Sequence, residues 1–214
     1  MTTPRPPGRT RDRILDTSLR LFNEEGFTGV STHLIATETG ISAGNLHYHF
    51  RSKEQLVSLL LSRFETRLPP CLEARAGITA LDDFWLALHL TFETIETYRF
   101  LYRDIDSLTR DYPALAPRLR ALTARCLVAV HALIDGLVSA GVLRATPEDI
   151  DMLALQTIFA MTCWQTFSRL TPTARATPGQ DSALAAYYTL TLLAPHVTPG
   201  SRPYLDYLRA KYLR

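Results

Sequence analysis

The chain has few of the residues that build covalent or metal-dependent scaffolds. Only three of its 214 residues are cysteines, and Cys71, Cys126 and Cys163 lie far apart, with no C-x-x-C pair among them. This odd, scattered set argues against a disulfide framework and against a structural zinc site. We therefore expect no metal and no cofactor, and a reducing compartment suits these thiols. The 46% of hydrophobic residues can build a core without such supports.

Long apolar runs are also missing. The first residues contain no apolar stretch typical of a signal peptide, and no segment approaches the ~20 consecutive apolar residues of a membrane span. We therefore expect neither export nor membrane insertion, and we predict a cytoplasmic protein.

Motifs typical of common enzyme classes are absent from the sequence. It contains no H-E-x-x-H, no G-x-S-x-G, no P-loop and no glycine-rich dinucleotide motif. His47 and His49 are two positions apart, which on a helix turns their side chains about 200° away from each other, so they cannot easily share one metal ion. We expect no enzymatic activity.

Runs of alternating β-branched residues are lacking as well, so the predicted fold class is all-α. Apolar residues at helical spacing predict a first helix over residues 10–25, and capping signals predict a second that ends at Gly40 and a third that begins after Ser42. The later helices are predicted over residues 53–68, 78–98 with Thr79 as cap, 98–109, 113–140, 147–170, 182–193 and 203–213.

Residues 40–56, G-I-S-A-G-N-L-H-Y-H-F-R-S-K-E-Q-L, are the most informative segment. Gly40 can adopt the left-handed conformation that closes a helix, and Ser42 can cap the next one. Phe50 closes that helix against the core, and S-x-x-Q from Ser52 is a capping box for the following helix. Asn45, His47, Tyr48 and His49 are left pointing mostly outward. Adjacent exposed hydrogen-bonding side chains on a short helix indicate a surface that reads something, and the tight turn before it indicates a helix-turn-helix.

The segments R-I-L-D-T-S-L-R-L-F-N-E-E-G-F-T-G-V-S-T and G-I-S-A-G-N-L-H-Y-H-F-R-S-K-E-Q-L resemble the N-terminal domain of the tetracycline-repressor (TetR/AcrR) family. The resemblance implies an all-helical homodimer. It implies a three-helix, helix-turn-helix DNA-binding domain, placed here at residues 11–52, and a C-terminal effector-binding and dimerisation domain at residues 53–214. Its partner would be a double-stranded DNA operator.

The same resemblance supplies the predicted DNA-binding residues, in which Lys53 would hold a phosphate. They are Ser31, Thr32, His33, Ser42, Ala43, Gly44, Asn45, His47, Tyr48, His49 and Lys53. The family often has arginine at the position of His33 and most often tyrosine at that of His47. The operator preferences of other members therefore cannot be transferred to this chain.

Residues 1–10 are predicted to be a disordered basic arm. Arg5 and Arg9 lie beside several prolines, and Arg11 and Arg13 continue the positive charge. On binding, such an arm could reach a phosphate or the minor groove. The alternative is a solubilising tail without function.

A small-molecule effector is the expected trigger, and its pocket is predicted among the central helices. The candidate lining residues are Trp85, His89, Phe92, Phe100, Tyr102, Cys126, Val130, Phe159, Cys163 and Phe167. Large apolar residues at helical spacing are more often plain core, but His89 and Tyr102 add polar groups that a dry core does not need. Because charge is sparse among these positions, we predict a mostly apolar or aromatic ligand.

The helices over residues 147–170 and 181–193 are the candidate dimer interface, because the first carries more apolar surface than one neighbour would cover. The predicted interface residues are Leu153, Thr157, Met161, Trp164, Leu184 and Tyr188. Two such helix pairs would form a four-helix bundle. The alternative is that both faces are covered within one subunit.

Together these features predict a sequence-specific transcriptional repressor, released from a near-palindromic operator by its effector. The competing hypothesis is a constitutive DNA-binding repressor or architectural protein with no small-molecule effector. A C-terminal domain without a cavity would favour this second hypothesis.

Overall fold

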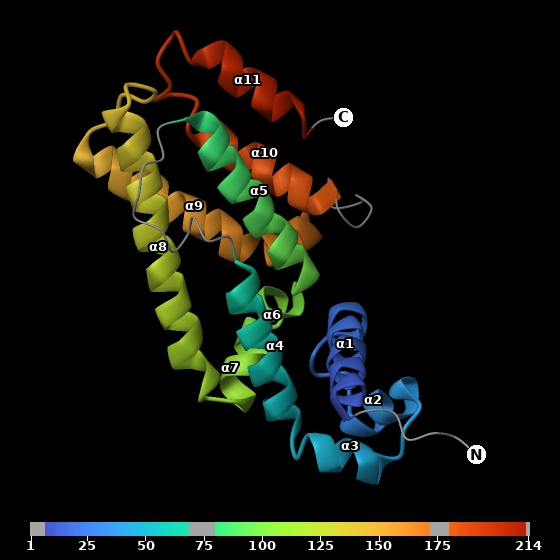
Figure 1. Cartoon of the computed structure of the whole chain (residues 1–214). Helices are drawn as coiled ribbons and strands as arrows, with labels where there is room; N and C mark the ends of the chain where they lie inside the picture. The colour runs from blue at the N-terminus through green and yellow to red at the C-terminus, as the bar shows by residue number, and fades with distance from the viewer. Residues whose placement is uncertain (1–6, 69–79, 172–179, 213–214) are drawn as a thin grey trace. The chain divides into compact units, whose positions relative to one another are not determined.

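The computed structural model describes residues 7–68, 80–171 and 180–212, and the regular structure of these residues is helical (Figure 1). One antiparallel bridge, between Leu143 and Val197, joins two loops. The described residues form two compact units. The first contains residues 7–66 with 98–117, and the second contains residues 67–68, 80–97, 118–171 and 180–212. The all-α prediction is confirmed.

The first unit begins with three helices that follow one another in sequence. They are α1 (Pro7–Glu25), α2 (Thr32–Thr39) and α3 (Ala43–His49), and α4 (Lys53–Arg67), α6 (Phe100–Arg103) and α7 (Ile105–Asp111) complete the unit. Fully buried aromatic rings form its centre, where the Phe22 ring lies 5.7 Å from Phe27 and 5.2 Å from Phe100 between centroids. Because α1 begins at Pro7, residues 7–10 of the predicted disordered arm are helical, and residues 1–6 lie outside the described part.

The compact unit is larger than the predicted DNA-binding domain of residues 11–52. Most of α4 and the segment 98–117 pack with the first three helices, because their aromatic residues share one core. The Phe64 ring of α4 meets Tyr98 and Tyr102 edge-on, at 5.7 and 5.8 Å between centroids. The first unit therefore brings together two segments that are distant in sequence.

The helix predicted over residues 98–109 is interrupted. Asp104, with φ −107° and ψ 21°, separates α6 from α7. Its carboxylate accepts a hydrogen bond from the backbone N–H of Phe27 at 2.8 Å. A tertiary contact thus accompanies the break, and local sequence periodicity could not have revealed it.

The second unit is a packed set of helices from the later part of the chain. These are α5 (Leu81–Thr97), α8 (Leu115–Ser139, whose first three residues belong to the first unit), α9 (Pro147–Phe167) with a 3-10 turn at Ser168–Leu170, α10 (Gln180–Leu192) and α11 (Arg202–Ala210). Helix α10 packs against α5, α9 and α11. Helix α5 begins at Leu81, and the predicted cap Thr79 lies outside the described residues. The predicted start of α9 is confirmed by a full capping box between Thr146 and Asp149.

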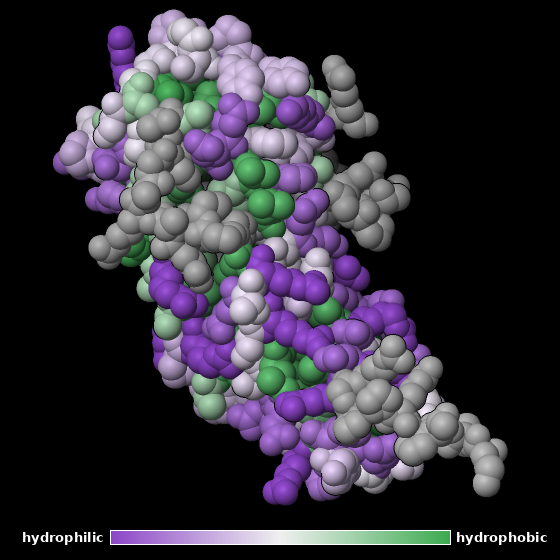
Figure 2. Space-filling model, in the orientation of Figure 1, coloured by the Kyte–Doolittle hydropathy of each residue, from purple (hydrophilic) through white to green (hydrophobic). Residues whose placement is uncertain are grey.

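Among the described helices, α8 alone is long and apolar enough to cross a membrane. One such helix is weak evidence, because core helices pass the same test. Helix α8 buries Val130, Leu133, Ile134 and Leu137, while most of its apolar window is not buried. In the view of Figure 2, both units show hydrophilic surface interrupted by apolar patches.

The end of α2 provides a test of local folding. Gly40 closes this helix with φ +70°, a conformation that alanine adopts only at a cost. We expect Gly40→Ala to lower the free energy of unfolding by about 1 kcal/mol, measured by chemical denaturation. Gly44→Ala is the matched control, since Gly44 lies in α3 without positive φ and a Cβ there meets nothing within 4 Å. Equal losses in both variants would contradict the role of the left-handed conformation.

Candidate DNA-binding surface and effector pocket

Serine caps and buried apolar anchors hold α2 and α3 in place. The Ser31 hydroxyl accepts from the backbone N–H of Leu34 at 3.1 Å, and the Ser42 hydroxyl accepts from that of Asn45 at 3.2 Å. On the inner side, Leu46 and Phe50 are buried. Since each helix start is capped and the inner face is anchored, the backbone of α3 is a rigid support for its outer side chains.

The predicted DNA-binding residues from α2 and α3 gather at the exposed side of this support. Ser31, Thr32, His33, Ser42, Ala43, Gly44, Asn45, His47 and Tyr48 are exposed, and His49 is half-buried. Tyr48 is 82% exposed, although it is a large aromatic residue, and its ring lies 5.3 Å from that of His49. Exposed hydrogen-bonding and aromatic groups on a short, anchored helix have the arrangement needed for contact with base edges in a major groove.

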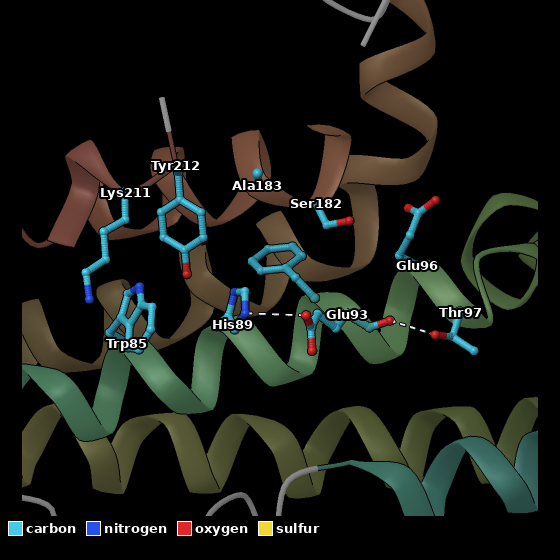
Figure 3. A pocket seen from close by; sticks show the side chains of 10 residues that line it. Trp85, His89, Glu93, Glu96, Thr97, Ser182, Ala183, Lys211 and Tyr212 are labelled. Carbon is cyan, nitrogen blue, oxygen red and sulfur yellow. Dashed lines mark hydrogen bonds and ion pairs between the residues drawn. The ribbon is translucent and has the colours of Figure 1, made fainter. Parts of the chain in front are cut away.

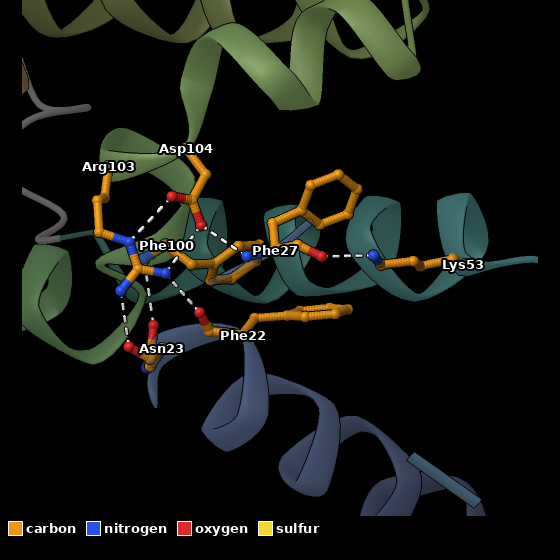
Figure 4. Close-up of polar contacts among 7 residues, drawn as sticks. All are labelled: Phe22, Asn23, Phe27, Lys53, Phe100, Arg103 and Asp104. Atoms are coloured by element: carbon orange, nitrogen blue, oxygen red, sulfur yellow. Dashed lines mark hydrogen bonds and ion pairs between the residues drawn. The ribbon is translucent and has the colours of Figure 1, made fainter. Parts of the chain in front are cut away.

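Lys53 is engaged inside the first unit (Figure 4). Its ammonium group donates to the backbone oxygen of Phe27 and lies 3.9 Å from the centroid of the Phe27 ring. Burial lowers the pKa of Lys53 from its ordinary value, while Asp111 and Asp104 act in the opposite direction. These contacts assign Lys53 a structural task at the turn between α1 and α2. Its predicted phosphate contact stays a prediction.

Two arginines beside α3 were not among the predicted DNA-binding residues. Exposed Arg11 and Arg51 line a groove of about 440 Å³ together with Tyr48, His49 and Gln55. The guanidinium of Arg11 lies 5.4 Å from the centroid of the Phe50 ring. The guanidinium groups of Arg11 and Arg51 are suited to contact DNA phosphates on either side of a major groove that α3 would enter. The charge of each was visible in the sequence, but their approach to one groove depends on the packing of α1 against α3 and α4.

A second set of contacts fixes the C-terminal end of α1 (Figure 4). Arg103 donates to the backbone oxygens of Phe22 at 2.6 Å and Asn23 at 2.8 Å, and it pairs with Asp104 at 2.8 Å. The backbone N–H of Phe100 donates to the side-chain oxygen of Asn23 at 3.1 Å. A cation on the last carbonyls of a helix is electrostatically favourable. Residues 98–104 therefore hold the turn that leads from α1 to α2.

The predicted effector-pocket residues do not gather in one place. Trp85, His89 and Phe92 line a cavity of about 610 Å³ in the second unit (Figure 3). Val130 lines a much smaller cavity with Thr157 and Met161, while Phe100 and Tyr102 belong to the first unit. The remaining predicted residues are Cys126 and Cys163, both half-buried, and Phe159 and Phe167, both exposed.

The larger cavity has lining residues that the sequence reasoning missed. Glu93 and Glu96 continue the same face of α5, and Lys211 and Tyr212 approach from the segment after α11. Burial raises the pKa of the Tyr212 phenol, so this side chain stays neutral. Helical spacing from Trp85 could have indicated the two glutamates, because positions 85, 89, 93 and 96 share a face. The cavity is therefore more polar than the predicted one.

Most of the predicted dimer-interface residues are covered within the chain. Leu153, Thr157, Met161 and Trp164 are buried, Leu184 is half-buried and Tyr188 is exposed. The exposed apolar residues of this region are Met152, Leu155, Phe159, Phe167 and Leu170. Those on α9 follow helical spacing, so α9 has an apolar outer stripe in addition to its buried one.

The described residues contain no group of three or more histidine, cysteine or acidic side chains placed to hold a metal ion.

Comparisons with known proteins identify both parts of the chain. Residues 14–60 match the family described as bacterial regulatory proteins, tetR family, and residues 63–205 match the family described as bacterial transcriptional repressor, TetR. The crystal structure of a TetR-family transcriptional regulator from Marinobacter aquaeolei VT8 is 32% identical with a TM-score of 0.85, over 95% of this chain and 98% of that chain.

More distant relatives agree. The ketosteroid transcriptional regulator KstR2 of Mycobacterium tuberculosis shares the fold at 18% identity and a TM-score of 0.66, over 92% of this chain and 100% of that chain. The probable HTH-type transcriptional regulator YttP of Bacillus subtilis (strain 168) is 29% identical over 104 residues, which are 45% of this chain and 50% of that protein. The chain thus aligns with about half the length of this curated relative. The resemblance seen in the sequence is confirmed.

Proposed function

Because the chain belongs to the TetR family of DNA-binding transcriptional regulators, we propose that it is a repressor that a small, mostly apolar or aromatic effector releases from a near-palindromic operator. The family regulates transcription by binding DNA and is not a family of enzymes. The observation that carries the proposal is the anchored helix α3, whose outer side chains include His47 and the largely exposed Tyr48. We place this activity in the cytoplasm.

A second copy of the chain is the proposed partner for the apolar outer stripe of α9. Met152, Leu155 and Phe159 lie at spacings of three and four residues and are each more than half exposed. An isologous contact through α9 and α10 would bury these side chains from both copies. In a dimer, two α3 helices about 34–36 Å apart would enter successive major grooves, which corresponds to one helical turn of DNA.

The proposed release route follows the chain from α5 into the first unit. Residues 98–104 continue directly from α5, which lines the 610 Å³ cavity, and Arg103 holds the C-terminal end of α1. A ligand that favours one arrangement of α5 would bias the position of this segment, and with it the support of α2 and α3. The ligand's differential affinity for the two arrangements sets how far the population shifts.

Selection of bound sequences from a random DNA pool tests the proposal. We expect one near-palindromic operator. We expect His47→Ala to relax discrimination at particular base pairs by about 1–3 kcal/mol each. Arg51→Ala is the matched control for positioning: it should weaken all sequences alike and reduce the slope of log affinity against log salt by about 1. Recovery of no preferred sequence would overturn the proposal, and identical effects of the two variants would overturn the assignment of His47 to reading.

The constitutive alternative, a repressor or architectural protein without an effector, predicts an operator affinity that is indifferent to small molecules. The cavity between α5, α10 and the C-terminal segment favours the effector-dependent hypothesis, since it offers a site of the size that small ligands occupy. Titrations of the operator complex with ligands that bind this cavity distinguish the two hypotheses.

A further inference from the structure

The cavity along α5 has an aromatic end (Figure 3). The rings of Trp85 and His89 are stacked, with centroids 5.4 Å apart and planes 7° from parallel. The Tyr212 ring lies 5.8 Å from His89 and 6.4 Å from Trp85 between centroids. Together these three rings form a surface on which a flat or extended apolar body can lie.

The opposite end is acidic. Glu93 and Glu96 follow His89 on the same face of α5, one and two turns further along. The Nε2 atom of His89 is 3.4 Å from the Glu93 carboxylate, and Gln165 donates to the Glu96 carboxylate at 3.2 Å. The carboxylates of Glu93 and Glu96 both line this end of the cavity.

The aromatic end already holds a cation that belongs to the chain. The Lys211 ammonium lies 4.5 Å from the centroid of the Trp85 ring and 4.9 Å from that of Tyr207. These distances are those of favourable cation–π contacts. A second cation at this end would be repelled by Lys211, which directs the positive group of any ligand toward Glu93 and Glu96.

We propose that this cavity binds an organic cation, a protonated amine on an aromatic or alkyl body, with its ammonium group at Glu93 and Glu96 and its body against Trp85, His89 and Tyr212. This ligand is the mostly apolar effector of the proposed function with one positive charge added. The inference rests on that function only in making the cation the releasing ligand, whereas the binding itself stands on the cavity. The volume of about 610 Å³ accommodates a ligand of this size.

Calorimetric titration of the full chain with three probes of equal length tests the charge requirement. The probes are phenylbutylamine, phenylbutanol and phenylvalerate, which carry a cationic, a neutral and an anionic end group on the same body. We expect the amine to bind roughly tenfold more tightly than the alcohol, because two partly exposed ion pairs contribute together, and the anion to bind most weakly. No binding of the amine, or equal binding of all three probes, would overturn the proposal.

Substitutions locate the charge within the cavity. We expect Glu93→Gln and Glu96→Gln each to weaken amine binding about threefold to fivefold, with little effect on the alcohol. Asp135→Asn is the matched control, because it removes one exposed negative charge from α8, outside the cavity lining. Circular dichroism establishes that each variant is folded. A loss in the control as large as in the glutamate variants would overturn the assignment of the ammonium site.

Operator binding separates this inference from the proposed function. Fluorescence anisotropy of a selected operator is measured with and without phenylbutylamine. Glutamate-dependent release of DNA supports both the cation site and its role as the trigger. Glutamate-dependent binding without release supports the cation site and contradicts the proposed effector role. Release that is unaffected by Glu93→Gln and Glu96→Gln contradicts the cation site and leaves effector control in force.

Discussion

Replacing Arg103 with alanine is expected to lower the free energy of unfolding of the first unit by about 2–4 kcal/mol. The Arg103 side chain is only 13% exposed, and its loss leaves the backbone oxygens of Phe22 and Asn23 and the carboxylate of Asp104 without this donor. Removing one partner from a largely buried charged pair costs more than the pair itself contributes, since the other charge remains. Urea denaturation followed by circular dichroism measures the change.

Arg110→Ala is the matched control for this prediction. Arg110 lies in α7, is 69% exposed and pairs with Asp111 at 3.4 Å, so its removal is expected to change the free energy of unfolding by less than about 0.5 kcal/mol. Arg103→Lys keeps the charge but loses the forked geometry that reaches three acceptors, and it should fall between wild type and Arg103→Ala. Similar losses for Arg103→Ala and Arg110→Ala would show that the contacts of Arg103 contribute no more than a surface pair.

The helix ends near the candidate DNA-binding surface were predictable from the sequence, whereas the helix break at Asp104 was not. Ser31, Gly40 and Ser42 act on backbone groups within a few residues, so their capping roles follow from local sequence. The carboxylate of Asp104 instead accepts from the N–H of Phe27, 77 residues earlier. No local pattern reports such a partner, so residues 98–109 were predicted as one helix.

The capping box before α4 shows a finer limit. The backbone N–H of Gln55 donates to the Ser52 hydroxyl at 3.2 Å, as the S-x-x-Q pattern predicted. The side-chain oxygen of Gln55, however, accepts from the N–H of Arg51 at 2.9 Å. Sequence spacing thus indicated the helix start correctly, but the reciprocal bond goes to the residue before the cap.

The cavity was predictable only on its α5 side. Trp85, His89 and Phe92 recur at helical spacing, which placed them on one face from sequence alone. Lys211 and Tyr212 come from more than a hundred positions later and have no periodic relation to that face. Conversely, Phe100 and Tyr102 are suitable by residue type, yet they form part of the core of the first unit. Residue chemistry could suggest members of a pocket, but the long-range packing of α5 with the C-terminal segment decides which ones meet.

The inner and outer faces of α9 pose a related difficulty. This helix carries apolar residues around most of its circumference, so periodicity could not decide which stripe faces its own subunit. The structure covers Leu153 and Met161 and exposes Leu155 and Phe159. The role of α9 in dimerisation stays a prediction. Substitutions of exposed residues such as Leu155 and Phe159 test it.

If α9 forms the proposed dimer contact, Phe159→Asp is expected to convert the dimer to a monomer and to weaken operator binding at least about 100-fold. Phe159 is 66% exposed in the single chain, so the change should leave the fold of each subunit intact. In an isologous interface the substitution occurs twice, and a central aromatic residue commonly contributes about 2 kcal/mol or more per copy. A total near 4 kcal/mol lowers the dimerisation constant about a thousandfold. Analytical ultracentrifugation measures the association, and fluorescence anisotropy measures operator binding.

Val128→Asp separates a specific interface from a general effect of placing a carboxylate on apolar surface. Val128 lies on α8 and is 60% exposed, close to the exposure of Phe159, so the two variants introduce the same charge into similarly solvated positions. If α9 forms the dimer contact, Val128→Asp should remain dimeric and bind the operator normally. The reverse pattern, in which Val128→Asp dissociates the dimer and Phe159→Asp does not, would show that the interface lies on α8 and not on α9. In either case we expect loss of the proposed dimer to reduce operator affinity, because a single α3 would contact only one half-site and would lose the gain in effective concentration that a linked second half-site provides.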